Sequence, residues 1–365
     1  MAGIYVHIPF CKSRCVYCGF YSTTRLESRQ RYVDALCREW QMRCSEITEN
    51  VRTIYIGGGT PSQLSIPQLA QLFDSLGTAE EFTLECNPDD VTEDFALFLA
   101  DSPVNRVSMG AQTFSDERLR FLRRRHTAVQ IGLAMEHLRK AGIGNISLDL
   151  IYGFPGETLT DWLCDVSDVL SLSPEHLSAY ALSYEEGTPL HGMLQRGEVS
   201  EIDEELSRTM YYYLIDRLAT EGFEHYEISN FARKGRRSLH NSNYWNHTPY
   251  VGLGAAAHSY DGNRCRRWNI SDVEAYIEAI EAGELLTGQE IFDDASFYND
   301  LLMTSLRTAE GLSLRILQPA QRAYCLAASR SFIADGLLLQ STDSLRLTRR
   351  GLFVSDMIIA ELMMV

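Results

Sequence analysis

Short apolar runs alternate with amphipathic segments through the first half of the chain, and this alternation restricts the possible fold more than any other feature. The six strand-like runs are residues 4–8, 53–56, 82–85, 106–109, 146–150 and 177–182. The helical segments between them are residues 29–48, 67–76, 94–100, 129–141 and 159–172. Strands that alternate with helices in this way predict parallel β-α-β units with right-handed crossovers, and therefore an α/β fold.

Six such units fit either an open doubly wound sheet or a partial (β/α)6 barrel, and in both folds ligands bind at the carboxyl ends of the strands. Chemically unusual residues occur at or near five of these ends. They are a cysteine group after the first strand, residues 57–61 after the second, Glu85 in the third, Gln112 after the fourth and Asp149 in the fifth. We therefore expect one functional site at this edge of the sheet.

The pattern changes after about residue 200. Residues 201–221 predict a long helix, residues 223–268 are aromatic-rich and predict irregular backbone, and the pattern is helical again from residue 271. Two apolar runs around a polar turn, at residues 337–347, predict a hairpin before a final helix. We expect a partial barrel (1–200), a segment that completes it (201–270) and a small helical, winged-helix-like C-terminal domain (271–365).

The charge and the hydropathy pattern exclude several classes of protein. The 365 residues include 33 basic and 49 acidic side chains, a net charge of -16 that disfavours nonspecific nucleic-acid binding. The first ten residues lack the features of a signal peptide. No run of about 18 apolar residues predicts a transmembrane helix, which leaves only peripheral membrane contact. We expect a cytoplasmic protein, as a monomer or a homodimer.

Three of the nine cysteines lie within eight residues, with the spacing C-x3-C-x2-C: Cys11, Cys15 and Cys18. In a reducing compartment such a group is more often a metal site than a disulfide framework. Three thiolates can ligate three irons of a [4Fe–4S] cubane and leave the fourth iron open for a chelating substrate. A zinc site with His7 as its fourth ligand is the alternative, since structural zinc needs four ligands.

The segment YVHIPFCKSRCVYCGF, residues 5–20, resembles the radical-SAM superfamily. The resemblance is closest to the branch related to oxygen-independent coproporphyrinogen dehydrogenase. Residues 85–88 (ECNP), 106–114 (RVSMGAQTF) and 149–158 (DLIYGFPGET) match the same branch. The resemblance implies a [4Fe–4S] cluster on the three cysteines and S-adenosylmethionine on its open iron, with reductive cleavage to a 5′-deoxyadenosyl radical as the superfamily's chemistry. It also implies a cofactor pocket formed by Tyr5, Tyr17, Gly58, Gly59, Thr60, Glu85, Gln112, Arg124 and Asp149.

The string HNSNYW, residues 240–245, lies outside the predicted barrel strands. A lone histidine is more often a surface or hydrogen-bonded residue than a ligand. This string, however, resembles the heme-binding HNxxYW motif of the heme chaperones in the same branch. The resemblance implies His240 as a heme contact, with Tyr244 and Trp245 packing on the macrocycle. It further implies heme as a third cofactor and a heme-accepting protein, a respiratory one in that family, as partner.

Two departures separate the chain from the dehydrogenases of the branch. Those enzymes carry a fourth cysteine two residues after the third, where this chain has Phe20, and a long extension before the cysteine group, which here starts at residue 11. We therefore favour a heme chaperone. The alternatives are oxidative decarboxylation of coproporphyrinogen III to protoporphyrinogen IX and another radical-SAM modification reaction. Whether S-adenosylmethionine is cleaved, and whether heme attaches covalently, stays open at this point.

Overall fold

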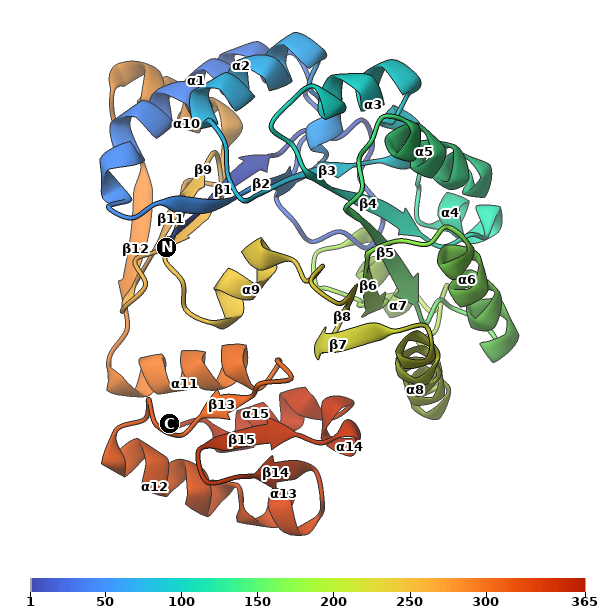
Figure 1. Ribbon diagram of the computed structural model, residues 1–365, viewed down its shortest axis with the longest axis vertical. Helices are drawn as coiled ribbons and strands as arrows, with labels where there is room; N and C mark the ends of the chain where they lie inside the picture. The colour runs from blue at the N-terminus through green and yellow to red at the C-terminus, as the bar shows by residue number, and fades with distance from the viewer. Residues whose placement is uncertain (1, 365) are drawn as a thin grey trace.

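The computed structural model describes residues 2–364 and contains one large sheet curved into a partial barrel (Figure 1). Six consecutive strands at its centre are parallel: β1 (Ala2–Ile8), β2 (Val51–Gly58), β3 (Glu81–Cys86), β4 (Arg106–Gln112), β5 (Ile146–Tyr152) and β6 (His176–Ala181). All six predicted strands are confirmed. They lie side by side in chain order. The sequence-based expectation of a partial (β/α)6 barrel is therefore correct.

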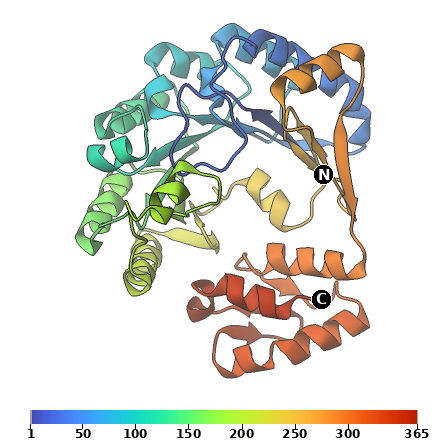
Figure 2. The same cartoon turned by 180° about the vertical axis from the view of Figure 1, so that it is seen from behind.

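Helices cover the outer face of this sheet (Figures 1 and 2). The five predicted between the strands are α1 (Arg29–Arg43), α2 (Ile66–Leu76), α3 (Glu93–Ala100), α5 (Ala128–Lys140) and α6 (Leu159–Ser171), and a sixth prediction corresponds to α8 (Glu204–Thr220). Two short helices, α4 (Asp116–Phe121) and α7 (Pro189–Gln195), were not predicted. Capping residues determine where several helices begin. In front of α6, for example, the Asp161 carboxylate accepts a hydrogen bond from the Thr158 amide.

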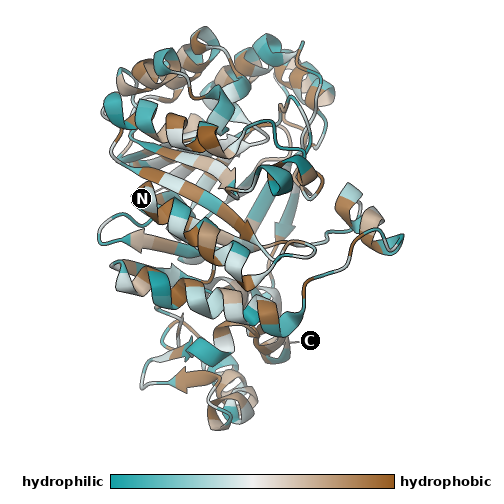
Figure 3. Ribbon diagram, turned by 90° about the vertical axis from the view of Figure 1, so that its right-hand side faces the viewer, coloured by the Kyte–Doolittle hydropathy of each residue, from teal (hydrophilic) through white to brown (hydrophobic). Residues whose placement is uncertain are grey.

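Side chains of the parallel strands alternate between two environments. Apolar residues such as Ile4, Val6 and Ile54 pack against the helices in the main core, where they are fully buried. The opposite positions carry polar or aromatic side chains that contact one another, as Tyr5 and Tyr55 do. In Figure 3, hydrophobic and hydrophilic residues both occur along the strands of the sheet. The barrel interior is therefore polar, which suits it to hold ligands.

The prediction of irregular backbone over residues 223–268 was wrong. That segment forms β7 (Phe223–Glu227), β8 (Asn230–Arg233), α9 (Leu239–Trp245), β9 (Tyr250–Leu253), β10 (His258–Tyr260) and β11 (Cys265–Asn269). β9 runs parallel to β1, whereas β8 pairs with β6 in the antiparallel sense. Strands of three to five residues carry too few positions for alternation to show in the sequence.

The large sheet continues beyond residue 271, since β12 (Thr287–Ile291) pairs with β11. The helix before it, α10 (Val273–Ala282), packs against α1 on the barrel. A second hydrophobic core begins near Tyr298. Around it lie α11 (Asp294–Ser305), β13 (Leu312–Ser313), α12 (Pro319–Ala328), α13 (Arg330–Ala334), β14 (Leu338–Gln340), β15 (Ser344–Leu347), α14 (Arg349–Leu352) and α15 (Ser355–Leu362). The predicted helices with a terminal hairpin are present. The boundary at residue 271 stays a prediction.

The small domain sits below the barrel, with α9 between the sheet and α11 (Figure 1). Ion pairs join the two parts: Arg307 with Glu227, Arg266 with Asp300, Arg237 with Glu310, Arg264 with Asp294 and Arg349 with Asp216. Domain contacts of this charged kind resemble transient protein interfaces more than a continuous core. Within residues 2–364, no helix has the length and apolar character needed to cross a bilayer.

Candidate functional site

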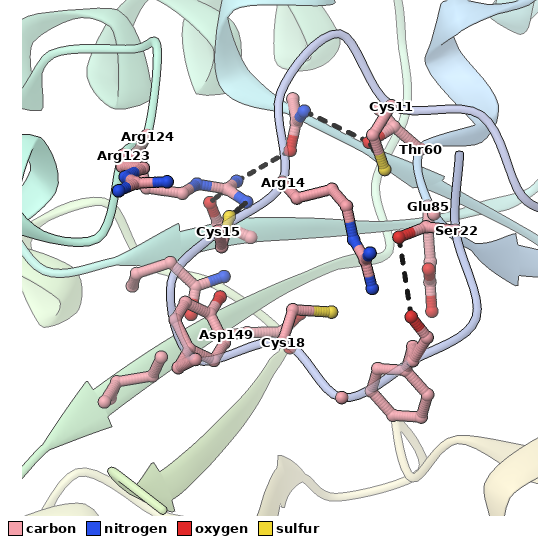
Figure 4. A pocket seen from close by; sticks show the side chains of 18 of the residues that line it. Cys11, Arg14, Cys15, Cys18, Ser22, Thr60, Glu85, Arg123, Arg124 and Asp149 are labelled. Carbon is pink, nitrogen blue, oxygen red and sulfur yellow. Dashed lines mark hydrogen bonds between the residues drawn. The ribbon is translucent and has the colours of Figure 1, made fainter. Parts of the chain in front are cut away.

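A cavity of about 780 Å³ opens at the carboxyl ends of the parallel strands. Its wall consists of the loop after β1, the glycine loop after β2 and residues from β3 to β6 (Figure 4). This is the edge at which α/β folds of this kind bind ligands. Eleven predicted site residues line it: Cys11, Cys15, Tyr17, Cys18, Gly58, Gly59, Thr60, Glu85, Gln112, Arg124 and Asp149.

The three cysteines are free thiols on the loop that follows β1. The Thr60 hydroxyl donates to the Cys11 sulfur at 3.6 Å, and the Arg124 guanidinium donates to the Cys15 sulfur at the same distance. Burial raises the pKa of Cys11 and of Cys18, while the charge of Arg124 acts in the opposite direction. A donor and a cation beside thiols favour the thiolate form that ligates metals. The arrangement therefore fits an iron–sulfur cluster.

The sulfur atoms face one cavity without converging on a single point. Within residues 2–364, no three potential metal-ligating side chains gather around one position. A cubane is compatible with this spread, because each of its three thiolates binds a different iron.

The glycine loop after β2 packs directly against the cysteine loop. A Cβ atom at Gly59 would lie 2.9 Å from the Cys11 sulfur and 2.8 Å from the Pro9 carbonyl carbon. Gly58 adopts a φ of +111°, which residues with a side chain rarely do. The loop therefore needs glycine at both positions, and its backbone groups are exposed to the cavity.

Two carboxylates from neighbouring parts of the sheet face the cavity. Glu85 accepts hydrogen bonds from the Tyr55 hydroxyl at 2.6 Å and from the Gly58 amide at 3.1 Å. Burial raises the pKa of Glu85 to about 7, and the negative charge of Asp149 adds to that effect. Burial likewise raises the pKa of Asp149 to about 6. Carboxylates in such positions can accept hydrogen bonds from the hydroxyl groups of a ribose.

Arg124 is held between the cysteine loop and β4. Besides Cys15, its guanidinium donates to the Asn87 side-chain oxygen at 2.6 Å and to the Gly110 carbonyl at 2.8 Å. Its neighbour Arg125 instead pairs with Asp89 and Asp90. All three arginines of residues 123–125 line the cavity, but Arg124 contacts the cysteine loop whereas Arg125 pairs with carboxylates, a difference that the sequence could not show.

Tyr5 does not line the cavity. Its hydroxyl lies 3.0 Å from the His7 Nδ1 atom, and its ring stacks on Tyr55 with centroids 6.3 Å apart. It therefore supports the residues around Glu85 from a deeper layer of the barrel. Sequence reasoning missed Ser108 and Tyr180, which do line the cavity. Residues at even spacing along a strand face the same side of the sheet, so the even spacing of these two residues from other inward-facing positions, such as Gln112 for Ser108, could have indicated them.

His240 lies at the opposite end of the barrel interior, on the helix α9 rather than on irregular backbone. Its Nδ1 atom is 2.9 Å from the Thr53 hydroxyl near the start of β2, and its Nε2 atom is 2.9 Å from the Tyr244 hydroxyl. The side chain is fully buried, and burial lowers its pKa to about 3. The imidazole is therefore neutral, which is the form that ligates metals.

The first turn of α9 is anchored at the start of β3. The Glu81 carboxylate accepts hydrogen bonds from the amides of Leu239 and His240, each at 2.8 Å. At the other end of the helix, the guanidinium of Arg307 lies 5.1 Å from the ring centre of Trp245. The HNxxYW string is therefore enclosed between the barrel and the C-terminal domain.

Comparisons with known proteins agree with this architecture. The family model of the radical SAM superfamily matches residues 5–165, and that of the HemN C-terminal domain matches residues 293–354. The solved structure of coproporphyrinogen III oxidase (HemN) from Escherichia coli superposes with a TM-score of 0.84 at 23% identity, over 99% of this chain and 89% of that one. At this identity the likeness shows the fold.

Curated relatives give a narrower assignment. The chain is 38% identical to the heme chaperone HemW of Lactococcus lactis, over 84% of this chain and 82% of that protein. It is 33% identical to the heme chaperone HemW of Mycobacterium tuberculosis, over 99% of this chain and 94% of that protein. The chain therefore belongs to the HemW family within the radical-SAM superfamily.

Proposed function

We propose that this protein is a heme chaperone, which binds heme at α9 and transfers it to an acceptor protein. The observation that carries the proposal is the HNxxYW string, whose His240, Tyr244 and Trp245 lie on one helix at the far end of a radical-SAM barrel. The identity to HemW proteins over most of the chain supports the same function.

The cavity residues hold the cofactors of the superfamily. Cys11, Cys15 and Cys18 would ligate the [4Fe–4S] cluster, which supplies an open iron for the amino and carboxylate groups of S-adenosylmethionine. The backbone of the loop from Gly58 to Thr60 would contact the methionine part, with Gln112 and Tyr17 close by. Glu85 and Asp149 would accept the ribose hydroxyls, and Arg124 would balance the negative charge of the thiolates.

His240 is the heme ligand in this proposal. Its imidazole is neutral, and its Nε2 atom would lose the hydrogen bond with the Tyr244 hydroxyl and bind the heme iron instead. Because the side chain is fully buried, α9 has to separate from its surroundings before heme can enter. The charged contacts between the barrel and the C-terminal domain, among them Arg307 with Glu227, are suited to such an opening.

The cellular compartment, the heme acceptor, the oligomeric state and the domain boundaries are also proposals. We place the protein in the cytoplasm, which is supported by nine cysteines that are all free thiols. A respiratory heme protein is the proposed acceptor, and size-exclusion chromatography decides between monomer and homodimer. We propose the division into a partial barrel (1–200), a segment that completes it (201–270) and a C-terminal domain (271–365), in which the elements from α11 onward surround a core of their own.

Anaerobic reconstitution of the cluster followed by two parallel assays tests the function. The first titrates heme and follows the Soret band; the second incubates the reduced protein with S-adenosylmethionine and coproporphyrinogen III. The proposal predicts saturable heme binding and no stoichiometric protoporphyrinogen IX. Turnover of coproporphyrinogen without heme binding would establish the decarboxylating enzyme instead.

A further inference from the structure

A guanidinium with two unpartnered nitrogen atoms is buried inside the barrel. The side chain of Arg106, on β4, is among the largest fully buried ones and is 1% exposed. Its Nε and Nη1 atoms have no hydrogen-bond partner among residues 2–364. A buried guanidinium is costly unless nearby negative charge offsets it. The barrel must therefore provide a compensating interaction for this residue.

The sheet register places Arg106 on the strand between those of the two cavity carboxylates and before the level of both, because Ser108 pairs with Glu85 on one side and with Ser147, two residues before Asp149, on the other. Strand β4 lies between β3, which carries Glu85, and β5, which carries Asp149. Arg106 pairs in register with Thr83, while Ser108, two residues further on the same face, pairs with Glu85 and lines the cavity. A two-residue step along a strand is about 6.6 Å, so the Arg106 side chain can reach the level of Glu85, and its charge acts on Asp149 from further away.

The positions around Arg106 leave space for its guanidinium. Thr83, Ser108 and Ser147 occupy the adjacent inward positions, and all three are small. The charge of Arg106 lowers the pKa of both Glu85 and Asp149, against the upward effect of burial. One cation therefore acts on both carboxylates.

We propose that Arg106 is a positioning residue of the S-adenosylmethionine site: its buried charge keeps Glu85 and Asp149 as the anions that accept the ribose hydroxyls. The inference rests on the S-adenosylmethionine site proposed above. It assigns a role to a residue of the RVSMGAQTF segment that does not itself line the cavity.

The other ionisable groups around this cluster keep their charge state between pH 6 and 9. They are Tyr5 on β1, Tyr17 after β1, Tyr55 on β2, Cys86 on β3, His176 and Tyr180 on β6, Tyr226 on β7, His240 and Tyr244 on α9, and Arg124 after α4. Burial raises the pKa of each tyrosine and of Cys86 and lowers the pKa of both histidines, so that all nine are neutral. Differences between variants in how affinity changes with pH therefore report on the two carboxylates, because the α-amino group of the ligand titrates equally in every experiment.

Calorimetric titration of S-adenosylmethionine into the cluster-loaded protein, from pH 6 to 9, tests the proposal. Arg106→Met removes the charge and keeps much of the length, whereas Arg106→Lys keeps the charge. Arg139→Met is the matched control, because Arg139 is a partly buried arginine that pairs with Glu175 away from the cavity. The wild-type affinity should rise with pH through the ionisation of Glu85, near 7, and of the ligand's own α-amino group, whose ordinary pKa of about 7.7–8.0 contributes equally in every variant.

The expected result is that Arg106→Met weakens binding at least tenfold at pH 7, moves the midpoint upward by one unit or more and regains affinity by pH 9. The Lys variant and the Arg139→Met control should follow the wild type. The proposal would be overturned if the Met or the Lys variant lost affinity for S-adenosylmethionine by the same factor at every pH. It would also be overturned if the Met variant bound S-adenosylmethionine as tightly as the wild type.

A measurement without cofactor separates this inference from the proposed site. Carbon-13 NMR of the apo protein gives the pKa of Glu85 and of Asp149, and both values should be higher in Arg106→Met than in the wild type. Unchanged values would overturn the role of Arg106. Absence of S-adenosylmethionine binding by the wild-type protein would instead refute the proposed cofactor site.

Discussion

The imidazole of His240 stacks on the ring of Tyr55, with centroids 5.1 Å apart and planes inclined by 25°. At its other end, the hydroxyl of Tyr55 donates the 2.6 Å hydrogen bond to Glu85. A single side chain thus contacts both the proposed heme ligand and a proposed ribose-binding carboxylate. Tyr55 therefore links the two ends of the barrel interior, and substitutions of Tyr55 can separate their roles.

Replacing Tyr55 with phenylalanine should weaken S-adenosylmethionine binding and leave heme binding unchanged. The substitution removes the hydrogen bond that holds Glu85 as an anion, a loss of about 1.5–3 kcal/mol that corresponds to roughly tenfold or more in affinity. The ring that packs on His240 remains. Calorimetry with each ligand measures both effects. Tyr276→Phe is the control, since Tyr276 is a buried tyrosine that donates to Glu39. An equal change in both affinities would contradict the separation.

Cys15→Ala should abolish the stable cluster. With two thiolates left, a second iron loses its protein ligand, so the iron content after anaerobic reconstitution should fall from about four to below one per chain. Cys164→Ala, at an exposed cysteine of α6, should retain full iron content. Iron and sulfide analysis with electron paramagnetic resonance provides the measurement. A Cys15→Ala protein with wild-type iron would refute the assignment of the cysteine group.

Glu85→Gln should stabilise the apo protein at alkaline pH while weakening cofactor binding. The folded pKa of Glu85 is about 7, above its ordinary value of 4.5, so the wild-type protein loses stability as pH rises from 4.5 to 7. At 1.36 kcal/mol per unit, the total is about 3 kcal/mol. Urea unfolding should show that gain for the variant at pH 8 and almost none at pH 4.5. Equal gains at both pH values would mean that the pKa is not raised.

Tyr244→Phe should tighten heme binding. The wild-type Tyr244 hydroxyl occupies the Nε2 atom of His240, and this bond, worth about 1 kcal/mol, must break before iron can bind. The phenylalanine ring still packs on a macrocycle, so the dissociation constant should fall about fivefold. Tyr324→Phe, on α12, is the control. Weaker binding by Tyr244→Phe would show that the hydroxyl contributes to the bound state instead.

The parallel strands could be predicted because each carries a continuous apolar face bounded by loops, as β1 and β5 show. The cysteine spacing and the strand-end positions indicated the edge of the sheet at which the cavity lies, and the resemblance to the radical-SAM superfamily named eleven residues that line it. These features are local in the chain. They depend on alternation and on the rule that strand ends gather at one edge of the sheet.

Other features depend on tertiary contacts and could not be predicted. The helix α9 contains two asparagines and a serine, which are poor helix formers, and it is fixed by Glu81 from β3. Nothing local indicates that Tyr5 lies below the cavity wall. The strands β10 and β12 have mixed sequences and form by pairing with β11. Such short antiparallel additions acquire their structure from the neighbouring strand rather than from their own pattern.

The most direct test of the heme assignment compares three proteins with intact clusters in a heme titration followed by absorption and resonance Raman spectra. The wild type and His258→Ala, a substitution at an exposed histidine of β10, should bind one heme per chain with the spectrum of a histidine-ligated iron. His240→Ala should lose that spectrum and at least tenfold in affinity. If His240→Ala instead kept the wild-type spectrum and affinity, heme would not be bound by α9, and the proposed chaperone site would be wrong.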